Sequence, residues 1–173
     1  TLSVSSAASD VYKRQVHQPP MRGLALAIPE PFGVMGVVAS DDQPLLGLLS
    51  MILPCIASGN RVVAVPSLKA ALIVADFYQL LDTSDVPGGV INLVTGVPSE
   101  LATVLAAHDD VAAIWAVGPA DECEQIKKES AGNLKCVWTS DGKSPDWYDS
   151  QTEGSSWLER ATQVKNIWVP YGE

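Results

Sequence analysis

Five short apolar runs recur along the chain from residue 33 onward, and segments with helical periodicity separate them. The runs are residues 33–39, 61–65, 90–94, 111–117 and 135–139. Each is continuous rather than alternating, which is typical of a strand that is buried on both faces. The pattern therefore predicts a mainly parallel sheet whose strands are joined by helices.

Two of the separating segments have the spacing of a single helix face. Three- and four-residue steps connect Ala70, Ile73, Val74, Phe77, Leu80 and Leu81, and then Leu101, Val104, Leu105 and His108. Boundary signals agree with a helix start at Pro44, N-caps at Ser67 and Ser99, a helix end at Gly59-Asn60, and a left-handed C-cap at Gly132 after Lys127-Lys128. The predicted fold is therefore an α/β domain, with a doubly wound, mainly parallel sheet of about five strands and helices on both faces.

The segments on either side of this domain, which is expected over residues 33–145, are less regular. Residues 16–32 are rich in proline and are expected to form an extended arm, as a strand that pairs outside the sheet. Residues 1–15 have no apolar core of the signal-peptide type and do not begin with Met, so we expect a non-native leader and a longer parent protein. In the tail, residues 146–173, a short helix is expected over 157–165 and a strand over 166–170.

Composition narrows the classes of partner. The 20 acidic and 11 basic residues give a net charge of −9, which disfavours nucleic acid, while 47% hydrophobic content is enough for a real core. The longest apolar stretch, residues 44–57, is shorter than the about 20 residues that a membrane span needs. The three cysteines lack metal-ligand spacing, which predicts a reduced, cytoplasmic setting and no metal site.

Loops that follow the expected strands are where a parallel sheet binds ligands; here they are residues 40–43, 66–69, 96–99, 118–121 and 140–143. Asp41-Asp42 is better explained as the N-cap of the next helix than as a general acid/base pair. His108, beside Asp109-Asp110, falls at a helix C-terminus, where a histidine more often interacts with the last-turn carbonyls than acts as a catalytic base.

None of the cysteines is a convincing nucleophile. Cys55 is expected inside a buried helix and Cys136 inside a strand, so both should behave as small apolar residues. Cys123 falls in a first helical turn, but its acidic neighbours oppose a lowered thiol pKa. The residues by themselves indicate an acidic α/β domain with ligand-capable loops and no assembled catalytic group.

Several segments, in order and spacing, resemble the cofactor-binding domain of the aldehyde dehydrogenase superfamily. They include Glu30-Pro-Phe-Gly, Gln43-Pro-Leu-Leu, Leu53-Pro-Cys-Ile-Ala-Ser-Gly-Asn-Arg-Val-Val, Pro87-Gly-Gly-Val-Ile-Asn-Leu-Val-Thr-Gly96 and Gly142-Lys-Ser-Pro145. The segments Arg22-Gly-Leu-Ala-Leu-Ala27 and Ile167-Trp-Val-Pro-Tyr-Gly-Glu173 are similar to the second, non-catalytic domain of aldehyde dehydrogenase family 16. The resemblance implies a Rossmann-like cofactor domain.

The family's catalytic groups do not carry over residue by residue. The resemblance places Asp42 where active relatives have an oxyanion-binding asparagine, and a carboxylate there repels the charge that it should stabilise. The segment that carries the general-base glutamate is shortened to Ser140-Asp141, where Asp141 is the possible substitute. The catalytic cysteine of the family lies beyond that segment, and the tail after Cys136 has no cysteine.

The cofactor loops are altered in the same way. Apolar Val65 and Leu68 stand at the two ribose-binding positions, and Pro119 offers neither a hydroxyl nor an N–H group to a pyrophosphate. Weak cofactor-binding candidates remain at Pro66, Ser67, Gly96 and Gly118. The resemblance therefore implies NAD(P) as the family's cofactor, but tight binding is not expected.

These substitutions favour one function and leave two alternatives open. The leading hypothesis is a catalytically inactive aldehyde-dehydrogenase-like domain that assembles with its own upstream aldehyde dehydrogenase domain or as a homo-oligomer. The alternative is a piece of an NAD(P)-dependent enzyme that oxidises aldehydes to carboxylic acids, with its active site outside this chain. A third is residual dinucleotide binding without chemistry. No nucleic-acid or membrane partner is expected.

Overall fold

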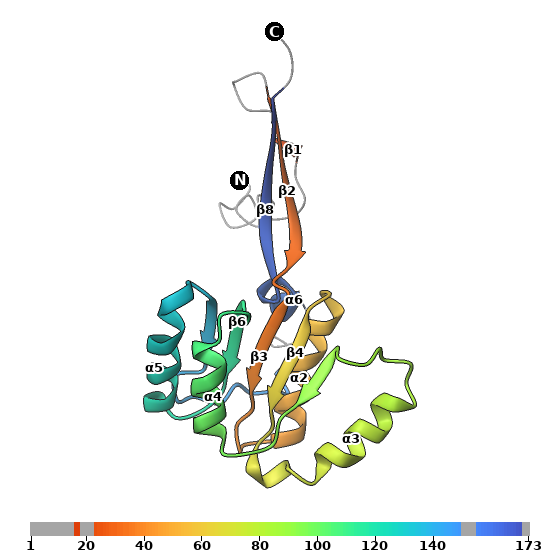
Figure 1. The fold of residues 1–173 in the computed structure, drawn as a ribbon, viewed down its shortest axis with the longest axis vertical. Helices are drawn as coiled ribbons and strands as arrows, with labels where there is room; N and C mark the ends of the chain where they lie inside the picture. Colours follow the sequence, from red (N-terminus) through yellow and green to blue (C-terminus); the bar gives the residue numbers. More distant parts are fainter. Residues whose placement is uncertain (1–15, 18–22, 150–154, 171–173) are drawn as a thin grey trace. The chain divides into compact units, whose positions relative to one another are not determined.

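The computed structural model describes residues 16–17, 23–149 and 155–170. The chain divides into two compact units. The larger unit spans residues 32–161, and the smaller unit combines the chain up to residue 31 with the chain from residue 162 onward. Figure 1 shows the elements of both. Each unit is described by itself.

The larger unit is built on a parallel sheet with the strand order β5-β4-β3-β6-β7. Its strands are β3 (Val34–Val38), β4 (Arg61–Val65), β5 (Ile91–Leu93), β6 (Ala113–Ala116) and β7 (Cys136–Thr139). All neighbouring strands are parallel. The chain runs outward from β3 to β4 and β5, and then crosses to β6 and β7 on the other side. The prediction of a doubly wound sheet of about five strands is confirmed.

Helices cover both faces of this sheet (Figure 1). They are α2 (Pro44–Ala57), α3 (Ile73–Asp82), α4 (Pro98–Ala107), α5 (Ala120–Glu129) and α6 (Ser155–Arg160), with 3₁₀ turns η1 (Leu68–Ala70) and η2 (Ser130–Asn133). Because strand side chains alternate, Val37 belongs to the cluster with α2 and Val38 to the cluster with α4 and α5. The continuous apolar runs follow from this two-sided burial.

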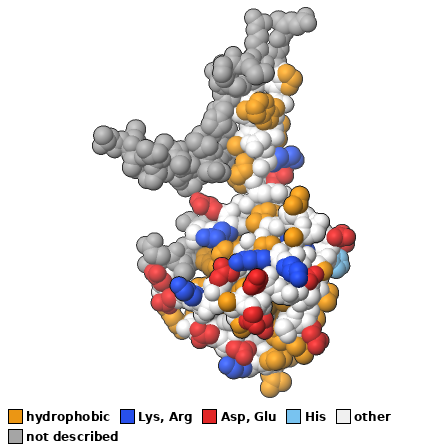
Figure 2. All heavy atoms as spheres, turned by 90° about the vertical axis from the view of Figure 1, so that its left-hand side faces the viewer, with side chains coloured by type: hydrophobic (Ala, Val, Ile, Leu, Met, Phe, Trp, Pro, Cys, Tyr) orange, Lys and Arg blue, Asp and Glu red, His pale blue; other side chains and the backbone are white. Residues whose placement is uncertain are grey.

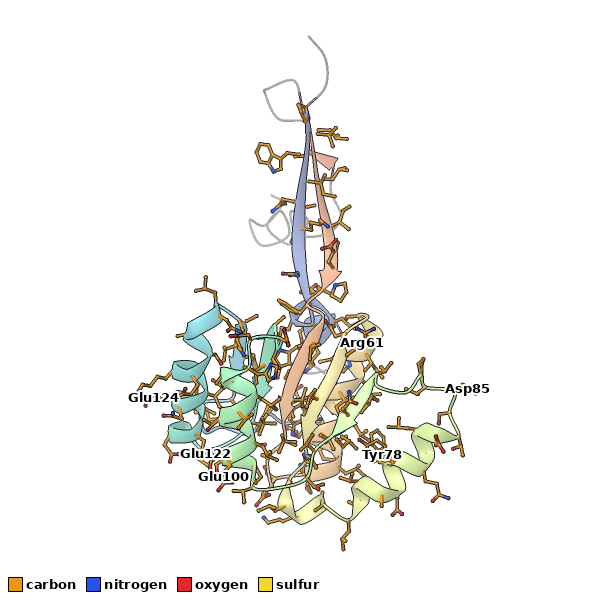
Figure 3. All side chains as sticks on the ribbon, in the orientation of Figure 1. Arg61, Tyr78, Asp85, Glu100, Glu122 and Glu124 are labelled. Atoms are coloured by element: carbon orange, nitrogen blue, oxygen red, sulfur yellow. The ribbon has the colours of Figure 1, made fainter. Side chains whose placement is uncertain are left out.

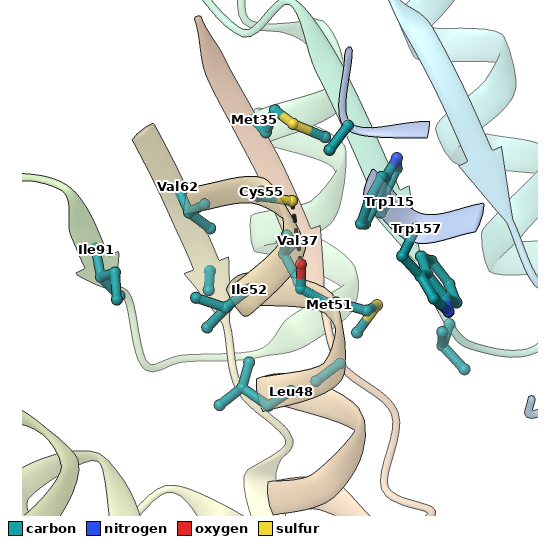
Figure 4. Packing of buried hydrophobic residues seen from close by; sticks show 14 of the residues in the cluster. Met35, Val37, Leu48, Met51, Ile52, Cys55, Val62, Ile91, Trp115 and Trp157 are labelled. Carbon is teal, nitrogen blue, oxygen red and sulfur yellow. Dashed lines mark hydrogen bonds between the residues drawn. The ribbon is translucent and has the colours of Figure 1, made fainter. Parts of the chain in front are cut away.

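Tryptophans dominate the core on the α2 side. Trp157, from α6, lies with its ring centroid 5.0 Å from that of Trp115 and 4.8 Å from that of Trp138. Figure 4 shows Trp157 beside Trp115, with Met51 and Val37 in the same cluster. The short helix of the tail thus completes the core of this face.

Asn60 is a buried polar residue whose side chain forms hydrogen bonds with three segments of the larger unit. Its side-chain oxygen accepts from the Gly33 N–H at 3.0 Å, and its amide nitrogen donates to the carbonyls of Cys55 at 3.1 Å and Ala161 at 2.8 Å. Gly59, at φ 90°, turns the chain out of α2. The predicted helix end at Gly59-Asn60 is confirmed.

Several expected boundaries are wrong. The helix α4 begins at Pro98 with Val97 at its N-cap, so Ser99 lies inside the first turn. The left-handed residue after α5 is Leu134, at φ 57°, rather than Gly132. In the tail, α6 ends at Arg160, short of the expected 157–165 helix, because the next residues join a strand.

Two helix faces are also less buried than their periodicity suggests. No residue of α3 is fully buried, and Leu80 is exposed. In α4 the buried residues are Ala102 and Ala106, whereas Val104 is exposed. The fully buried residues of α4 are therefore alanines, whereas Leu101 and Leu105 pack against the core while only partly buried.

The smaller unit is an antiparallel sheet with the order β1-β2-β8. Its strands are β1 (Val16–His17), β2 (Gly23–Pro31) and β8 (Thr162–Pro170). In this register Leu24 pairs with Val169 and Leu26 with Ile167, which places these four on one face. Figure 2 shows hydrophobic side chains along this sheet.

Across the described ranges, no helix is both long enough and apolar enough to cross a bilayer.

Candidate functional site

Loops at the carboxyl ends of β4, β3, β6 and β7 form one edge of the larger unit. Ladder hydrogen bonds continue past the strand ends, from the Ala39 N–H to the Val65 carbonyl at 3.0 Å and from the Ser140 N–H to the Ala116 carbonyl at 3.0 Å. The loops at residues 40–43, 66–69, 118–121 and 140–143 therefore follow neighbouring strands. A ligand of a doubly wound sheet binds at this edge.

The Asp41 carboxylate faces the next loop rather than the helix that follows it. It accepts a hydrogen bond from the Ser67 hydroxyl, and it lies 3.7 Å from the Lys69 ammonium. The N-cap of α2 is Gln43, at φ 49°, and no side chain caps the helix. The interpretation of Asp41-Asp42 as an N-cap is therefore wrong, although the predicted helix start at Pro44 is confirmed.

Asp42, the residue at the oxyanion position of the resemblance, is exposed. Its N–H group donates to the Ser40 hydroxyl at 3.3 Å, and its carbonyl accepts from the same hydroxyl at 3.1 Å. These bonds form a local turn. The ionised side chain has acceptors only, so it supplies no donor to an oxyanion.

Two features at the N-terminus of α5 disfavour an anion. The Gly118 N–H donates to the Ser140 hydroxyl at 3.3 Å, and Pro119 has no N–H group. A carboxylate oxygen of Glu122 lies 3.5 Å from where a Cβ on Gly118 would be. Figure 3 labels Glu122 on α5. A phosphate here would meet the negative charge of Glu122 and would lack the Gly118 N–H as a donor.

Asp141, the possible general base, is bound by two donors. Its carboxylate accepts from the Lys127 ammonium and from the Thr139 hydroxyl, the latter at 2.8 Å. These hydrogen bonds, with that from Lys127 the stronger influence, lower the pKa of Asp141 below its ordinary value of 3.8. Because a lower pKa means a lower affinity for protons, Asp141 is a poor base at neutral pH.

The remaining cofactor-binding candidates either have hydrogen-bond partners within the chain or lie in apolar surroundings. Ser67 is fully buried beside Pro66, and its hydroxyl donates to Asp41 while accepting the Lys69 N–H at 3.1 Å. The predicted N-cap role of Ser67 is confirmed, at the start of η1. Next to Gly96, a methyl of Leu101 lies 3.0 Å from where a Cβ would be. These residues are a poor fit for the hydroxyls and phosphates of a dinucleotide.

The cysteine thiols lie in three different environments. Cys55 is fully buried, its Sγ donates to the Met51 carbonyl at 3.1 Å, and burial raises its pKa to about 12. Cys123 is buried, with Sγ 3.5 Å from the Gly118 carbonyl. Cys136 is exposed, contrary to expectation, because β7 is an edge strand. Within the described part of the chain, no cluster of His, Cys, Asp and Glu could hold a metal.

His108 is the C-cap residue of α4, but its ring neither bonds the last-turn carbonyls, as expected, nor forms a dyad with an aspartate carboxylate. Its Nδ1 accepts from the Asp110 N–H at 3.2 Å. The last-turn carbonyls are satisfied by Lys135, whose ammonium donates to Leu105 at 3.1 Å and to His108 at 2.8 Å. Lys135 is buried, which lowers its pKa. Sequence reasoning missed this residue, although a lysine that begins an apolar strand run was a signal.

Comparison with known proteins gives a consistent family. Residues 2–147 match the model of the aldehyde dehydrogenase family. The NADP/NAD-dependent aldehyde dehydrogenase PuuC of Escherichia coli is 33% identical over 120 residues, which are 69% of this chain and 24% of that protein. The (Z)-2-((N-methylformamido)methylene)-5-hydroxybutyrolactone dehydrogenase of Acinetobacter baylyi is 31% identical over 159 residues, 91% of this chain and 32% of that protein.

Solved structures agree. The indole-3-acetaldehyde dehydrogenase AldA of Pseudomonas syringae, in complex with NAD⁺, superimposes with a TM-score of 0.68 and 30% identity, over 80% of this chain and 28% of that one. The AldC protein of the same organism, complexed with NAD⁺ and octanal, gives a TM-score of 0.64 and 30% identity. The match covers 66% of this chain and 24% of that one. This chain therefore spans about a quarter to a third of the length of these relatives.

Proposed function

The chain belongs to the aldehyde dehydrogenase family, and from that premise we propose that it is a catalytically inactive domain which serves assembly. Its partner is an upstream aldehyde dehydrogenase domain of the same protein or a second copy of this chain. The similarity to the second domain of aldehyde dehydrogenase family 16 favours the first partner. The three free cysteines support a reducing, cytoplasmic setting.

The loop at Gly118 and Pro119, which leads into α5, carries the proposal of inactivity. Two similar structures were solved with NAD⁺, whose pyrophosphate is an anion. Here the Gly118 N–H is engaged by Ser140, Pro119 has none, and Glu122 adds a negative charge. Without bound NAD(P)⁺, no acceptor is present for the hydride that leaves the aldehyde.

The catalytic groups support the same conclusion. A thiol with a pKa of about 12, like that of Cys55, stays protonated at neutral pH and is a poor nucleophile. Asp42 offers no donor to an oxyanion, and the proton affinity of Asp141 is lowered by Lys127.

The smaller unit supports an assembly role. Ile28 and Val169 lie on the same face as Leu24, and their side chains are 39% and 44% exposed. A sheet of few strands needs an apolar face to be covered for stability. Trp168, on the opposite face, is 69% exposed, and aromatic residues of this kind are enriched at interfaces.

Activity is tested by incubating the full chain with NAD or NADP and a panel of short, long and aromatic aldehydes. We expect no protein-dependent formation of NADH or NADPH. Any reduced cofactor that requires the protein and disappears on its denaturation would contradict the proposal. A catalytically active relative, the aldehyde dehydrogenase of Escherichia coli named above, serves as the positive control.

Assembly is tested by sedimentation of the chain over a wide concentration range. Self-association through this face predicts a species heavier than the monomer, and Val169→Lys should then return it to the monomer mass because the new charge would have to be buried. Gln163→Lys, at the polar end of the same strand, is the matched control and should leave the mass unchanged. A monomer at every concentration would contradict self-association and leave the upstream domain to be tested in the same way.

A second function is supported by the short coverage of the relatives. The chain can be a part of an active NAD(P)-dependent aldehyde dehydrogenase whose cysteine and glutamate lie elsewhere in the protein. A longer parent protein, if its transcript is recovered, would distinguish the two, because activity that survives deletion of residues 23–170 would assign this part to assembly. Activity that is lost while the remaining protein stays folded would favour a catalytic contribution.

A further inference from the structure

An apolar pocket in the larger unit lies between α2, η1, α3 and the end of β5. Its lining residues are all apolar: Leu45, Leu48, Ala70, Ile73, Val74, Phe77 and Leu93. The pocket encloses about 240 Å³, a volume that includes the solvent at its mouth. Pockets for drug-sized ligands typically measure about 300–1,000 Å³, so this one fits a single apolar side chain better than a whole small molecule.

Two hydrogen bonds hold α3 beside β5, the edge strand that forms one wall of the pocket. The hydroxyl of Tyr78, on α3 (Figure 3), accepts from the Leu93 N–H at 2.7 Å and donates to the Leu93 carbonyl at 3.4 Å. The walls are nevertheless incompletely covered, since the pocket residues Leu45 and Ile73 are 41% and 37% exposed. Leu80, seven residues after Ile73, lies on the same face of α3 and is also exposed. The pocket therefore opens onto an apolar surface that continues along α3.

Acidic side chains surround this apolar surface. Residues 70–126, which include α3, contain nine Asp and Glu residues and no Lys or Arg. Asp76 lies three residues after Ile73 and is therefore its neighbour on the surface of α3. Among the described residues Asp76 forms no salt bridge, whereas the ammonium of Lys69, in η1, lies 3.7 Å from the Asp41 carboxylate. The margin of the pocket thus carries negative charge that complements a cationic partner.

We propose that the pocket docks a basic amphipathic helix of a partner protein, with one aliphatic side chain of that helix in the pocket and its Lys or Arg residues beside Asp76. Such a helix presents apolar residues at three- and four-residue spacing with charges on its flanks, which matches an apolar pocket with an acidic margin. The docking surface belongs to the larger unit. It depends neither on assembly through the smaller unit nor on whether the chain retains catalysis.

The test titrates the full chain into a fluorescein-labelled helical peptide of Leu and Lys, with Leu at three- and four-residue spacing, and follows fluorescence anisotropy. One control peptide has Ala for every Leu, which keeps the helix propensity, and another has Glu for every Lys. We expect saturable binding of the Leu/Lys peptide, about tenfold weaker binding of the Ala/Lys peptide and no binding of the Leu/Glu peptide. Absence of binding by the Leu/Lys peptide, or equal binding by either control, would overturn the proposal.

A matched pair of variants on α2 locates the binding. Leu45 and Leu53 are 41% and 52% exposed, and only Leu45 lines the pocket. Leu45→Lys should weaken binding of the Leu/Lys peptide by about tenfold or more, because it places a positive charge at the mouth of the pocket. Leu53→Lys should change the affinity by less than about twofold. Equal losses from the two variants, or no loss from Leu45→Lys, would overturn the proposal.

A second pair of variants on the α3 side tests the fit without a change of charge. Ala70→Leu should fill the pocket and weaken binding of the peptide, whereas Ala75→Leu, at an exposed position of α3 outside the pocket, should leave it unchanged. An unchanged affinity in a folded Ala70→Leu variant would overturn the proposal. Sedimentation tests a second copy of the chain as the occupant. Self-association that Leu45→Lys abolishes and Val169→Lys leaves intact would assign the pocket to that copy and would likewise overturn the proposal.

Discussion

The two sheets of the chain differ in what covers their apolar side chains. In the parallel sheet, Val37 and Ile114 are fully buried, one under each layer of helices. In the antiparallel sheet, Ile28 and Val169 remain 39% and 44% exposed. The larger unit therefore buries its apolar strand residues, whereas the smaller unit leaves some of its own exposed, as the proposed assembly role requires.

The largest expected difference between the sheets is in their tryptophans. Trp157→Ala should lower the free energy of unfolding by about 3–5 kcal/mol, because it removes a buried ring from the centre of the aromatic cluster. Trp168→Ala, on the exposed sheet, should change it by less than about 0.5 kcal/mol. Urea unfolding followed by circular dichroism measures both, and similar losses would mean that the two sheets are equally covered.

Asparagines give the next largest contrast. Asn60→Leu should cost about 3 kcal/mol, because the buried groups of Gly33, Cys55 and Ala161 lose their partners. Asn166→Leu on exposed β8 is the matched control and should be nearly neutral. The same urea titrations apply, and a neutral Asn60→Leu would show that the amide network contributes little to the parallel sheet.

A buried lysine of the larger unit and an exposed lysine of the smaller unit should also differ in their contribution to stability. Lys135→Met should cost about 1–2 kcal/mol, because the last carbonyls of α4 lose a buried donor. Lys165 pairs with Glu30 at 2.9 Å on the exposed sheet, and Lys165→Met should cost at most about 1 kcal/mol. Urea unfolding of both variants measures their losses in the free energy of unfolding. A greater loss for Lys165→Met than for Lys135→Met would contradict the prediction.

The smallest expected effect lies at the loop edge and depends on pH. The pKa of Asp141 is lowered in the folded protein, so its contact with Lys127 adds stability that is present above the ordinary value of 3.8 and is lost as pH falls through the folded pKa. Asp141→Asn should therefore be slightly less stable than the native protein at pH 7, and the difference should shrink as the pH falls below 3.8. Tm measured across this range tests the sign, and a difference that grows in acid would contradict it.

The parallel sheet could be predicted because the sequence signals for each of its strands and helices lie within a few neighbouring residues. Each strand is a short apolar run, and Arg61–Val65 was predicted with both ends correct. Two-sided burial, turn glycines and prolines at helix starts act within a few residues, so sequence reasoning captures them.

The site could be predicted only as a set of loops, because its contacts join distant residues. The bond from Ser67 to Asp41, the bond from Gly118 to Ser140 and the packing of Trp147 on Gly47 depend on which strands are neighbours. The capping interpretation of Asp41 failed for this reason, since a tertiary partner outcompeted the local N–H groups. The exposure of Cys136 likewise depends on the strand order, which periodicity does not encode.

The bond between the Gly118 N–H and the Ser140 hydroxyl also bears on how a phosphate site could be engineered into this chain. Replacement of Pro119 by serine would add an N–H group and a hydroxyl, but the Gly118 N–H would stay engaged and Glu122 would still place a negative charge beside it. A phosphate site at this helix would therefore need changes at Ser140 and Glu122 as well as at Pro119.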